Sequence, residues 1–290
     1  MRGIRWTLIT GSVVLLASCT PQVVQLPPEQ VLRSAAEAVQ QLTSADFTLQ
    51  GTFIGLLGGR EEVALDTQGR LQDGGKQLAF SITTTLKNPA VDDEVSTVSA
   101  DVVVAAEEEI YVQMKELSGD MLKTLLDGTH MTPSDTWWKF PADGDGASAH
   151  VTPDPTLLRA QAQVITVTHD DGIGSIDGRP VYRYTTAVDR EKLRQYLQTV
   201  ASTQGQTFDE AAFERTWGAI AITGTIAIDA QTFTIHDLTW AFAPLQGMEG
   251  LHGNLHVLLS SFNAASPIVP PSRYTELPAG PLPMLPERTP

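Results

Sequence analysis

The segment AIAITGTIAID, residues 219–229, places isoleucine on one face of an extended chain and mostly alanine or threonine on the other. This period of two predicts a strand with one buried face. TFTIHDLTWAF (232–242) and LHGNLHVLLSSF (251–262) continue the alternation after short turns. Three such strands in succession favour an antiparallel meander over a parallel sheet. The apolar faces of these strands carry Ile220, Ile222, Ile226 and Ile228; His236, Leu238, Trp240 and Phe242; and Leu251, Leu255, Val257 and Leu259.

Strands also dominate the first half of the chain. Phe47, Leu49 and Phe53 alternate and predict a first strand with one apolar face. Turn segments such as GLLGGR and QDGGK separate it from later strands. These further strands are predicted over residues 61–67, 76–87, 95–105 and 109–115.

Four helices are predicted from helical spacing and from capping residues. Asp189 is a good N-cap for the third, and Thr207 with Glu210 forms a capping box for the fourth. The predicted helices cover residues 29–42, 117–127, 189–202 and a segment from 207 that carries Phe213 and Trp217, whereas residues 141–153 are predicted as a loop.

The C-terminal segment differs in composition from the rest. From Asn263 onward, the last 28 residues hold eight of the 18 prolines and show no periodicity. We therefore expect residues 263–290 to be extended or disordered, strapped along the domain at first and free at the end. Residues 29–262 then form one domain.

The N-terminus has the layout of a secretory signal peptide. Arg2 and Arg5 precede an apolar run from Trp6 to Ala17, which is too short for a typical spanning helix of about 20 residues. The run ends at Cys19, the only cysteine in the chain. Leu16-Ala17-Ser18-Cys19 resembles the lipobox of bacterial lipoproteins, which implies cleavage after residue 18 and lipidation of Cys19. Residues 19–28 would then be a tether, and the anchored protein would lie on the outer face of the plasma membrane or in the outer membrane.

Composition limits the possible partners. Cleavage after residue 18 leaves 272 residues (290 − 18) and, without Arg2 and Arg5, changes the formal charge from −15 to −17. A hydrophobic fraction of 42% is sufficient for a core, and one cysteine leaves no disulfide to support it. The pI of about 4.7 argues against nucleic acid and against electrostatic docking on anionic lipids.

The polar motifs do not indicate catalysis or a strong metal site. His252 and His256 on one strand would lie about 13 Å apart, too far to share an ion. DGDG at 143–146 departs from the EF-hand pattern, so a flexible acidic loop is the simpler interpretation. HDDGIGSIDG at 169–178 is predicted as a turn between strands, with adventitious calcium as the alternative. Glu107, Glu108 and Glu109 alternate between faces and indicate a solvated strand end.

Catalytic motifs are absent from the sequence as well. It has no Gly-x-Ser-x-Gly, no Ser-x-x-Lys set, no Gly-rich phosphate loop and no thiol other than Cys19. We therefore predict a protein that is not an enzyme and needs no cofactor.

The layout resembles the LolA-like lipoprotein carriers and the mycobacterial LppX/LprG-type lipoproteins. The resemblance rests on the leading helix running into ADFTLQGTF, on EEIYVQM, DTWWKF and SIDGRPVYRYTTAVDREKLRQYL, and on the closing hairpin ITGTIAIDAQTFTIHDLTWAF. It implies an α+β fold, mainly antiparallel, in which a large curved half-barrel sheet has helices over its concave face. Many members of this family carry acyl chains between the sheet and the helices.

The leading hypothesis is therefore an exported, lipid-anchored protein that binds a lipid or another acyl-chain ligand without a covalent bond. One alternative is a structural or interaction lipoprotein with a filled core, and another is an envelope sensor. In DTWWKF, Trp137 or Trp138 would lie at a pocket rim, or one indole would be in the core and the other half exposed. The predicted lining residues are Phe47, Leu49, Phe53, Val102, Val104, Ile220, Ile222, Leu238, Trp240 and Leu255.

Overall fold

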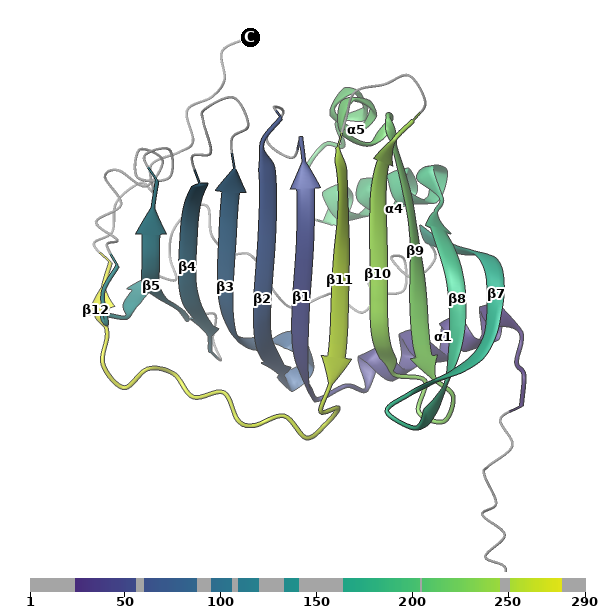
Figure 1. Ribbon diagram of the computed structural model, residues 1–290, viewed down its shortest axis with the longest axis horizontal. Helices are drawn as coiled ribbons and strands as arrows, with labels where there is room; N and C mark the ends of the chain where they lie inside the picture. Colours follow the sequence, from purple (N-terminus) through teal and green to yellow (C-terminus); the bar gives the residue numbers. More distant parts are fainter. Residues whose placement is uncertain are drawn as a thin grey trace, which may run out of the picture.

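A single large sheet forms the framework of the protein (Figure 1). The structure is a computed structural model, and it describes residues 24–55, 60–87, 95–105, 109–119, 133–140, 164–203, 205–245 and 251–277. Within these residues, twelve strands follow the order β12-β6-β5-β4-β3-β2-β1-β11-β10-β9-β8-β7. Neighbouring strands are antiparallel except for β12 and β6, which are parallel.

The strands that the alternation of the sequence predicts are present in the structure, together with further strands. The strands are β1 (Ser44–Ile54), β2 (Glu62–Gln72), β3 (Gln77–Lys87), β4 (Val95–Val104), β5 (Ile110–Ser118), β6 (Trp138–Phe140), β7 (Ile165–Ile176), β8 (Arg179–Val188), β9 (Ile220–Asp229), β10 (Ile235–Pro244), β11 (His252–Ser260) and β12 (Thr275–Glu276). The helices are α1 (Pro28–Gln40), η1 (Asp73–Gly75, a 3-10 turn), α4 (Arg190–Thr203) and α5 (Glu210–Trp217). The predicted α+β class, with a large antiparallel sheet and helices against one face, is confirmed.

The two faces of the sheet differ in chemistry. The register aligns Phe47 of β1 with Leu259 of β11 on one side and with Gly69 of β2 on the other. Residues of this parity form the face that α1 covers, which we call the inner face. The opposite, outer face carries mainly threonine, serine and charged side chains, such as Thr83, which donates to Ser99. This alternation is typical of a sheet with one face toward the core and one toward water.

Helix α1 builds the tightest part of the core. Its side chains Val31 and Ala35, one turn apart, are buried against Tyr182, Tyr184 and Ile228 of the inner face. Pro28 stands at the first helical position, where the missing N–H costs nothing because that group has no intrahelical partner. The amphipathic spacing of α1 therefore fixes it across β8 and β9.

Two helix predictions need correction. The capping box from Thr207 to Glu210 is wrong, because Asp209 is the N-cap of α5 and its Oδ1 accepts a hydrogen bond of 2.9 Å from the backbone N–H of Ala212. The helix predicted over residues 117–127 is wrong at its start, where residues 117 and 118 continue β5. The rest of that segment, like the loop predicted at 141–153, lies outside the described residues.

The predicted turn at 169–178 is also wrong for most of its length. Strand β7 continues to Ile176 and absorbs the acidic residues in two bulges, between Val167 and His169 and between Asp170 and Gly172. Only Asp177 and Gly178 form the turn, with φ values of 49° and 77°. Two consecutive positive φ values are typical of the tight hairpin turn that matches strand twist.

The chain after β11 crosses the outer face as a strap. Asn263 Oδ1 accepts hydrogen bonds from the N–H and the hydroxyl of Thr43. Further along, the side chain of Gln72 donates to Ser266 O and accepts from Ile268 N. Ile268 is buried against Val103, and the strap ends in β12 beside β6 (Figure 1). Residues 278–290 lie outside the described part.

Candidate functional site

The inner face brings together all ten residues predicted to line a ligand site. Phe47, Leu49 and Phe53 share their side of β1 with Leu255 of β11, and Leu255 pairs with Trp240 of β10. Ile222 pairs with Phe242, two residues beyond Trp240. Val102 pairs with Phe80, which in turn pairs with Gly69 of the inner face. The remaining members of the set, Val104, Ile220 and Leu238, have the same parity on their strands. Ligand binding by these residues stays a prediction.

The exposure of these ten side chains is the informative property. Phe53 and Val104 are buried, at 9% and 7% exposure, and the other eight are only half-buried. Apolar side chains under helices in a filled core are buried, because protein interiors pack as densely as organic crystals. The centre of the inner face is therefore incompletely covered.

Aromatic rings lie flat on this face because glycines stand beneath them. A Cβ added at Gly224 would come within 2.6 Å of the Trp240 ring, and one at Gly253 within 2.6 Å of the Phe53 ring. Phe53 and Phe242 in turn pack with ring centroids 5.7 Å apart. Glycine in a strand often marks such a close approach. The rings thus form a low apolar floor rather than projecting toward the helices.

Helix α4 stands over the inner face without closing on it. Its apolar stripe includes Leu193, Tyr196 and Leu197, yet no residue of this helix is buried. Between α1, α4 and β7 lies a groove of about 1200 Å³. Its walls are Pro27, Pro28, Glu29, Leu32, Arg33, Ala36, Glu37, Gln40, Ile165, Thr166, Val167, Lys192, Gln195, Tyr196 and Thr199.

Strand β8 carries the polar atoms buried under the helices. Tyr182 donates a hydrogen bond of 2.7 Å from its hydroxyl to Val24 O. Among the described residues, the buried hydroxyls of Tyr184 and Thr186 have no hydrogen-bond partner, and burial raises the pKa of Tyr184 to about 12. These residues are not among the ten predicted to line a ligand site, although Tyr182, Tyr184 and Thr186 alternate in PVYRYTTAV as clearly as those ten do on their strands.

His236 does not lie where the alternation places it. A bulge between Ile235 and Asp237 removes it from the register, and Ile235 instead packs against the inner core. The His236 ring contacts Phe262. Burial lowers the pKa of His236, although Asp229 nearby acts in the opposite direction. Burial alone would raise the pKa of the Asp229 carboxyl, but hydrogen bonds from the N–H groups of Thr232 and Gln231 outweigh it and lower that pKa.

His256 of the histidine pair and Glu109 of the glutamate run contact neighbouring polar side chains. His252 and His256 lie on β11 with outer-face parity, and His256 Nε2 lies 3.1 Å from Asp237 Oδ1. Glu109 accepts hydrogen bonds from Lys139 and Tyr111, and the bond from Lys139 is the main cause that lowers the pKa of Glu109. In the described part of the chain, no three metal-ligating side chains come together. Glu107, Glu108 and DGDG lie outside it.

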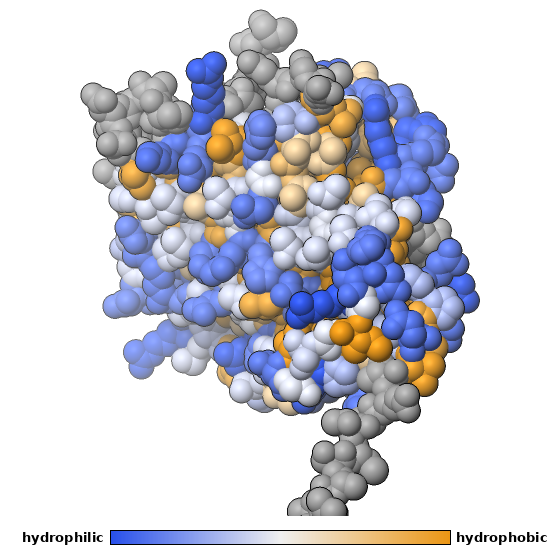
Figure 2. All heavy atoms as spheres, turned by 45° about the vertical axis from the view of Figure 1, so that its right-hand side comes forward, coloured by the Kyte–Doolittle hydropathy of each residue, from blue (hydrophilic) through white to orange (hydrophobic). Residues whose placement is uncertain are grey.

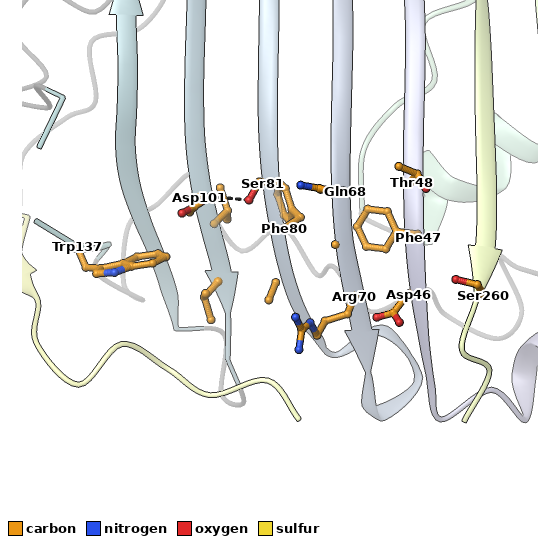
Figure 3. A pocket seen from close by; sticks show the side chains of 14 residues that line it. Asp46, Phe47, Thr48, Gln68, Arg70, Phe80, Ser81, Asp101, Trp137 and Ser260 are labelled. Atoms are coloured by element: carbon orange, nitrogen blue, oxygen red, sulfur yellow. Dashed lines mark hydrogen bonds between the residues drawn. The ribbon is translucent and has the colours of Figure 1, made fainter. Parts of the chain in front are cut away.

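A second groove, of about 580 Å³, lies across β1 to β4 and is mainly polar (Figure 3). Asp101 accepts a hydrogen bond of 2.6 Å from Ser81 and lies 3.2 Å from Lys115. Trp137 borders this groove, whereas Trp138 aligns with Val112 of the inner face. Both indoles are half-buried, so the prediction of one indole in the core with the other half exposed is wrong for the core indole. Phe47 and Val102 are also among the residues around this groove.

Known proteins of similar structure share little sequence with this chain. No family model matches the chain, and no curated protein sequence matches it. Among solved structures, the lipoprotein LppX of Mycobacterium tuberculosis aligns at 12% identity with a TM-score of 0.38, over 84% of this chain and 100% of that one. LprF of Mycobacterium bovis aligns at 14% identity with a TM-score of 0.44, over 84% and 98%.

A LolA superfamily protein from Nitrosomonas europaea aligns at 9% identity with a TM-score of 0.21, over 84% of this chain and 96% of that one. These are the groups that the sequence resembles. Because the identities and TM-scores are low, the similarities carry no functional conclusion on their own. Across the described residues, no helix has the length and hydropathy needed to cross a bilayer.

Proposed function

We propose that the protein binds a lipid or another acyl-chain ligand between the inner face of its sheet and its helices, without catalysis. The observation that carries the proposal is the half-buried state of eight of the ten apolar side chains on that face. Helix α4 supports it independently, because the side chains of its apolar stripe are only half-buried too. Two apolar surfaces that face each other without full contact are stabilised by an apolar occupant.

The chemistry of the inner face selects the ligand class. Its floor consists of rings and branched side chains such as Trp240, Phe53 and Leu255, which offer no charge to a headgroup. Each methylene buried on such a surface contributes about 0.8 kcal/mol. A chain of a dozen or more methylenes therefore binds through its length, and a polar headgroup remains toward the groove between α1, α4 and β7.

The proposed function includes an anchor at Cys19. A diacylglycerol joined to the Cys19 sulfur by a thioether would hold the protein at an envelope membrane, since two or more acyl chains anchor stably. Replacement by Cys19→Ala is expected to release the protein from membrane fractions and to abolish incorporation of a fatty-acid label. An unchanged distribution of the Cys19→Ala variant would contradict the anchor.

Native mass spectrometry of residues 20–290, purified without detergent, tests the binding directly. We expect a stoichiometric lipid adduct that organic extraction releases for identification. A clean apo mass that stays unchanged after incubation with fatty acids and phospholipids contradicts the proposal. That result favours instead a lipoprotein with a filled core that acts through a protein partner.

A matched pair of variants localises the ligand. Leu255→Arg introduces a cation into the apolar floor, whereas Asn254→Arg introduces it one residue away on the outer face of the same strand. Burying the cation against an acyl chain costs well over 1.4 kcal/mol, so Leu255→Arg should lower lipid occupancy at least about tenfold. Asn254→Arg should leave occupancy unchanged. Equal occupancy in the two variants would place the ligand elsewhere.

A further inference from the structure

The N-terminal segment that leads into α1 is fixed to the sheet. Val24 O accepts the hydroxyl hydrogen bond of Tyr182, and Gln25 Nε2 donates a bond of 3.0 Å to Asp170 Oδ2. Leu26 packs against the core cluster under α1. Three successive residues thus contact β7, β8 and the core, so the point where the chain leaves the domain is defined.

This exit point lies close to Cys19 along the chain. Five residue steps separate Val24 from Cys19 (24 − 19), and an extended chain covers at most roughly 17–18 Å over that distance. If Cys19 carries the anchor, as the proposed function requires, Val24 can rise no further than this above the lipid surface. A domain of this size therefore cannot tumble freely over the bilayer.

The surface around the exit point suits contact with lipid. Val24 is 69% exposed, and Ile173, which pairs with Tyr182, is 41% exposed. In the described part of the chain, β7 is the edge strand of the sheet and pairs with β8 alone. Figure 2, in which this side comes forward, shows apolar residues in orange among the polar ones near this lower edge.

The groove between α1, α4 and β7 borders the docked segment. Pro27 and Pro28, directly after the docked segment, form its wall together with α1, β7 and α4. The short tether, the exposed apolar side chains and one wall of the groove therefore all lie along the edge of the sheet that β7 forms.

We propose that this edge, formed by residues 24–28 and the end of β7 around Ile173, contacts the bilayer that holds the anchor, so that the groove opens toward the lipids. The inference rests on the proposed function. It makes the membrane itself the source or acceptor of the acyl chain and confines exchange to lipids beneath the protein. The contact is apolar, in keeping with the formal charge of −17 that remains after loss of Arg2 and Arg5 (−15 − 2), which disfavours electrostatic docking on anionic headgroups.

Site-specific labelling of the acylated full-length protein tests the contact. Since Cys19 is the only cysteine and is acylated in this state, Ile173→Cys and the control Val95→Cys each supply one free thiol for a polarity-sensitive fluorophore. Val95 is exposed to a similar extent, 47%, on a distant strand. In phosphatidylcholine vesicles with a lipid-borne quencher, we expect quenching and a blue shift at 173 and neither at 95.

A variant with a longer tether is the second part of the experiment. Insertion of a dozen Gly and Ser residues after Thr20 removes the distance limit and should reduce quenching at 173 severalfold, with the protein still bound to the vesicles. Equal quenching at 173 and 95 overturns the orientation. Quenching at 173 that persists with the longer tether overturns the role of the tether.

Flotation separates these outcomes from failure of the proposed function. If the protein fails to float with vesicles, the anchor is absent and both proposals fall. If it floats and retains its lipid adduct in native mass spectrometry but shows no quenching at 173, only the membrane-facing edge is overturned.

Discussion

The inner face of one sheet contains two regions with different packing. Over β8 and β9, α1 buries Tyr184 and Ile228 completely, at 0% exposure each. Over β1, β10 and β11, side chains of the same chemical type, such as Leu49 and Leu255, are half-buried. The difference arises from the helices that cover the sheet rather than from the strands. Helix α1 packs directly on β8 and β9 through small side chains, whereas α4 has no residue buried against the strands that it faces. Apolar alternation therefore builds both a core and a potential binding surface.

The largest expected effect tests this difference by truncation. Ile228→Ala leaves a cavity in the packed region and should lower the free energy of unfolding by about 2–5 kcal/mol. Leu255→Ala, in the half-buried region, should cost about 1 kcal/mol, since less apolar surface is lost from a packed environment. Urea unfolding of the ligand-free protein measures both.

Comparable losses for Ile228→Ala and Leu255→Ala would mean that the second region is a filled core. That result would count against the acyl-chain proposal as well, because it removes the space the ligand needs.

The second-largest effect is expected at Gly224, which lies beneath the Trp240 ring in the half-buried region. Gly224→Ala places a methyl group against the Trp240 ring and against Thr239 O, and it should cost about 1–3 kcal/mol by overpacking. It should also tilt the indole and shift tryptophan emission. Thr223→Ala, exposed on the outer face of the same strand, is the control and should change neither quantity. Normal stability of Gly224→Ala would show that the floor is not formed by rings lying on glycine.

Two tyrosines on β8 should have smaller and opposite effects on the free energy of unfolding when each is replaced by phenylalanine. Tyr182→Phe removes the hydrogen bond to Val24 O and should cost about 1 kcal/mol. Tyr184→Phe removes a buried hydroxyl that has no hydrogen-bond partner in the described part of the chain, so the change should be neutral or stabilising. Chemical denaturation of both variants measures the contrast. A marked loss in Tyr184→Phe would reveal a partner for that hydroxyl.

The smallest expected effect concerns pH. Burial lowers the pKa of His236 in the folded state, so the unfolded chain binds the proton more readily. Stability should therefore fall as the pH drops through about 6.5, the pKa of a histidine in an unfolded chain. Asp229, whose pKa is also lowered, loses its contribution only at lower pH, below the usual carboxyl range. Thermal melts between pH 7.5 and 5.5 of wild type and His236→Gln should show a flatter dependence in the variant. Parallel curves would show that another group titrates.

The sequence by itself determined which residues share a face. A period of two, read from 219–229 outward, predicted the antiparallel sheet, and all ten selected residues lie on its inner face. This succeeds because side-chain direction in a strand follows directly from position. The prediction from the period of two failed at His236 and in residues 169–178. There a bulge adds a residue, which moves the following side chains to the other face of the sheet, and the composition gives no clear sign of it.

Only the tertiary structure decided how the faces are covered. No local pattern states that α1 packs down on β8 while α4 stands off, since both helices carry an apolar stripe and the outcome depends on side-chain volumes from distant segments. The docking of Val24 on Tyr182, 158 residues away, is equally non-local. Burial and the shape of the grooves depend on many contacts between residues far apart in the chain. The sequence shows which residues are available for these contacts but not which of them meet.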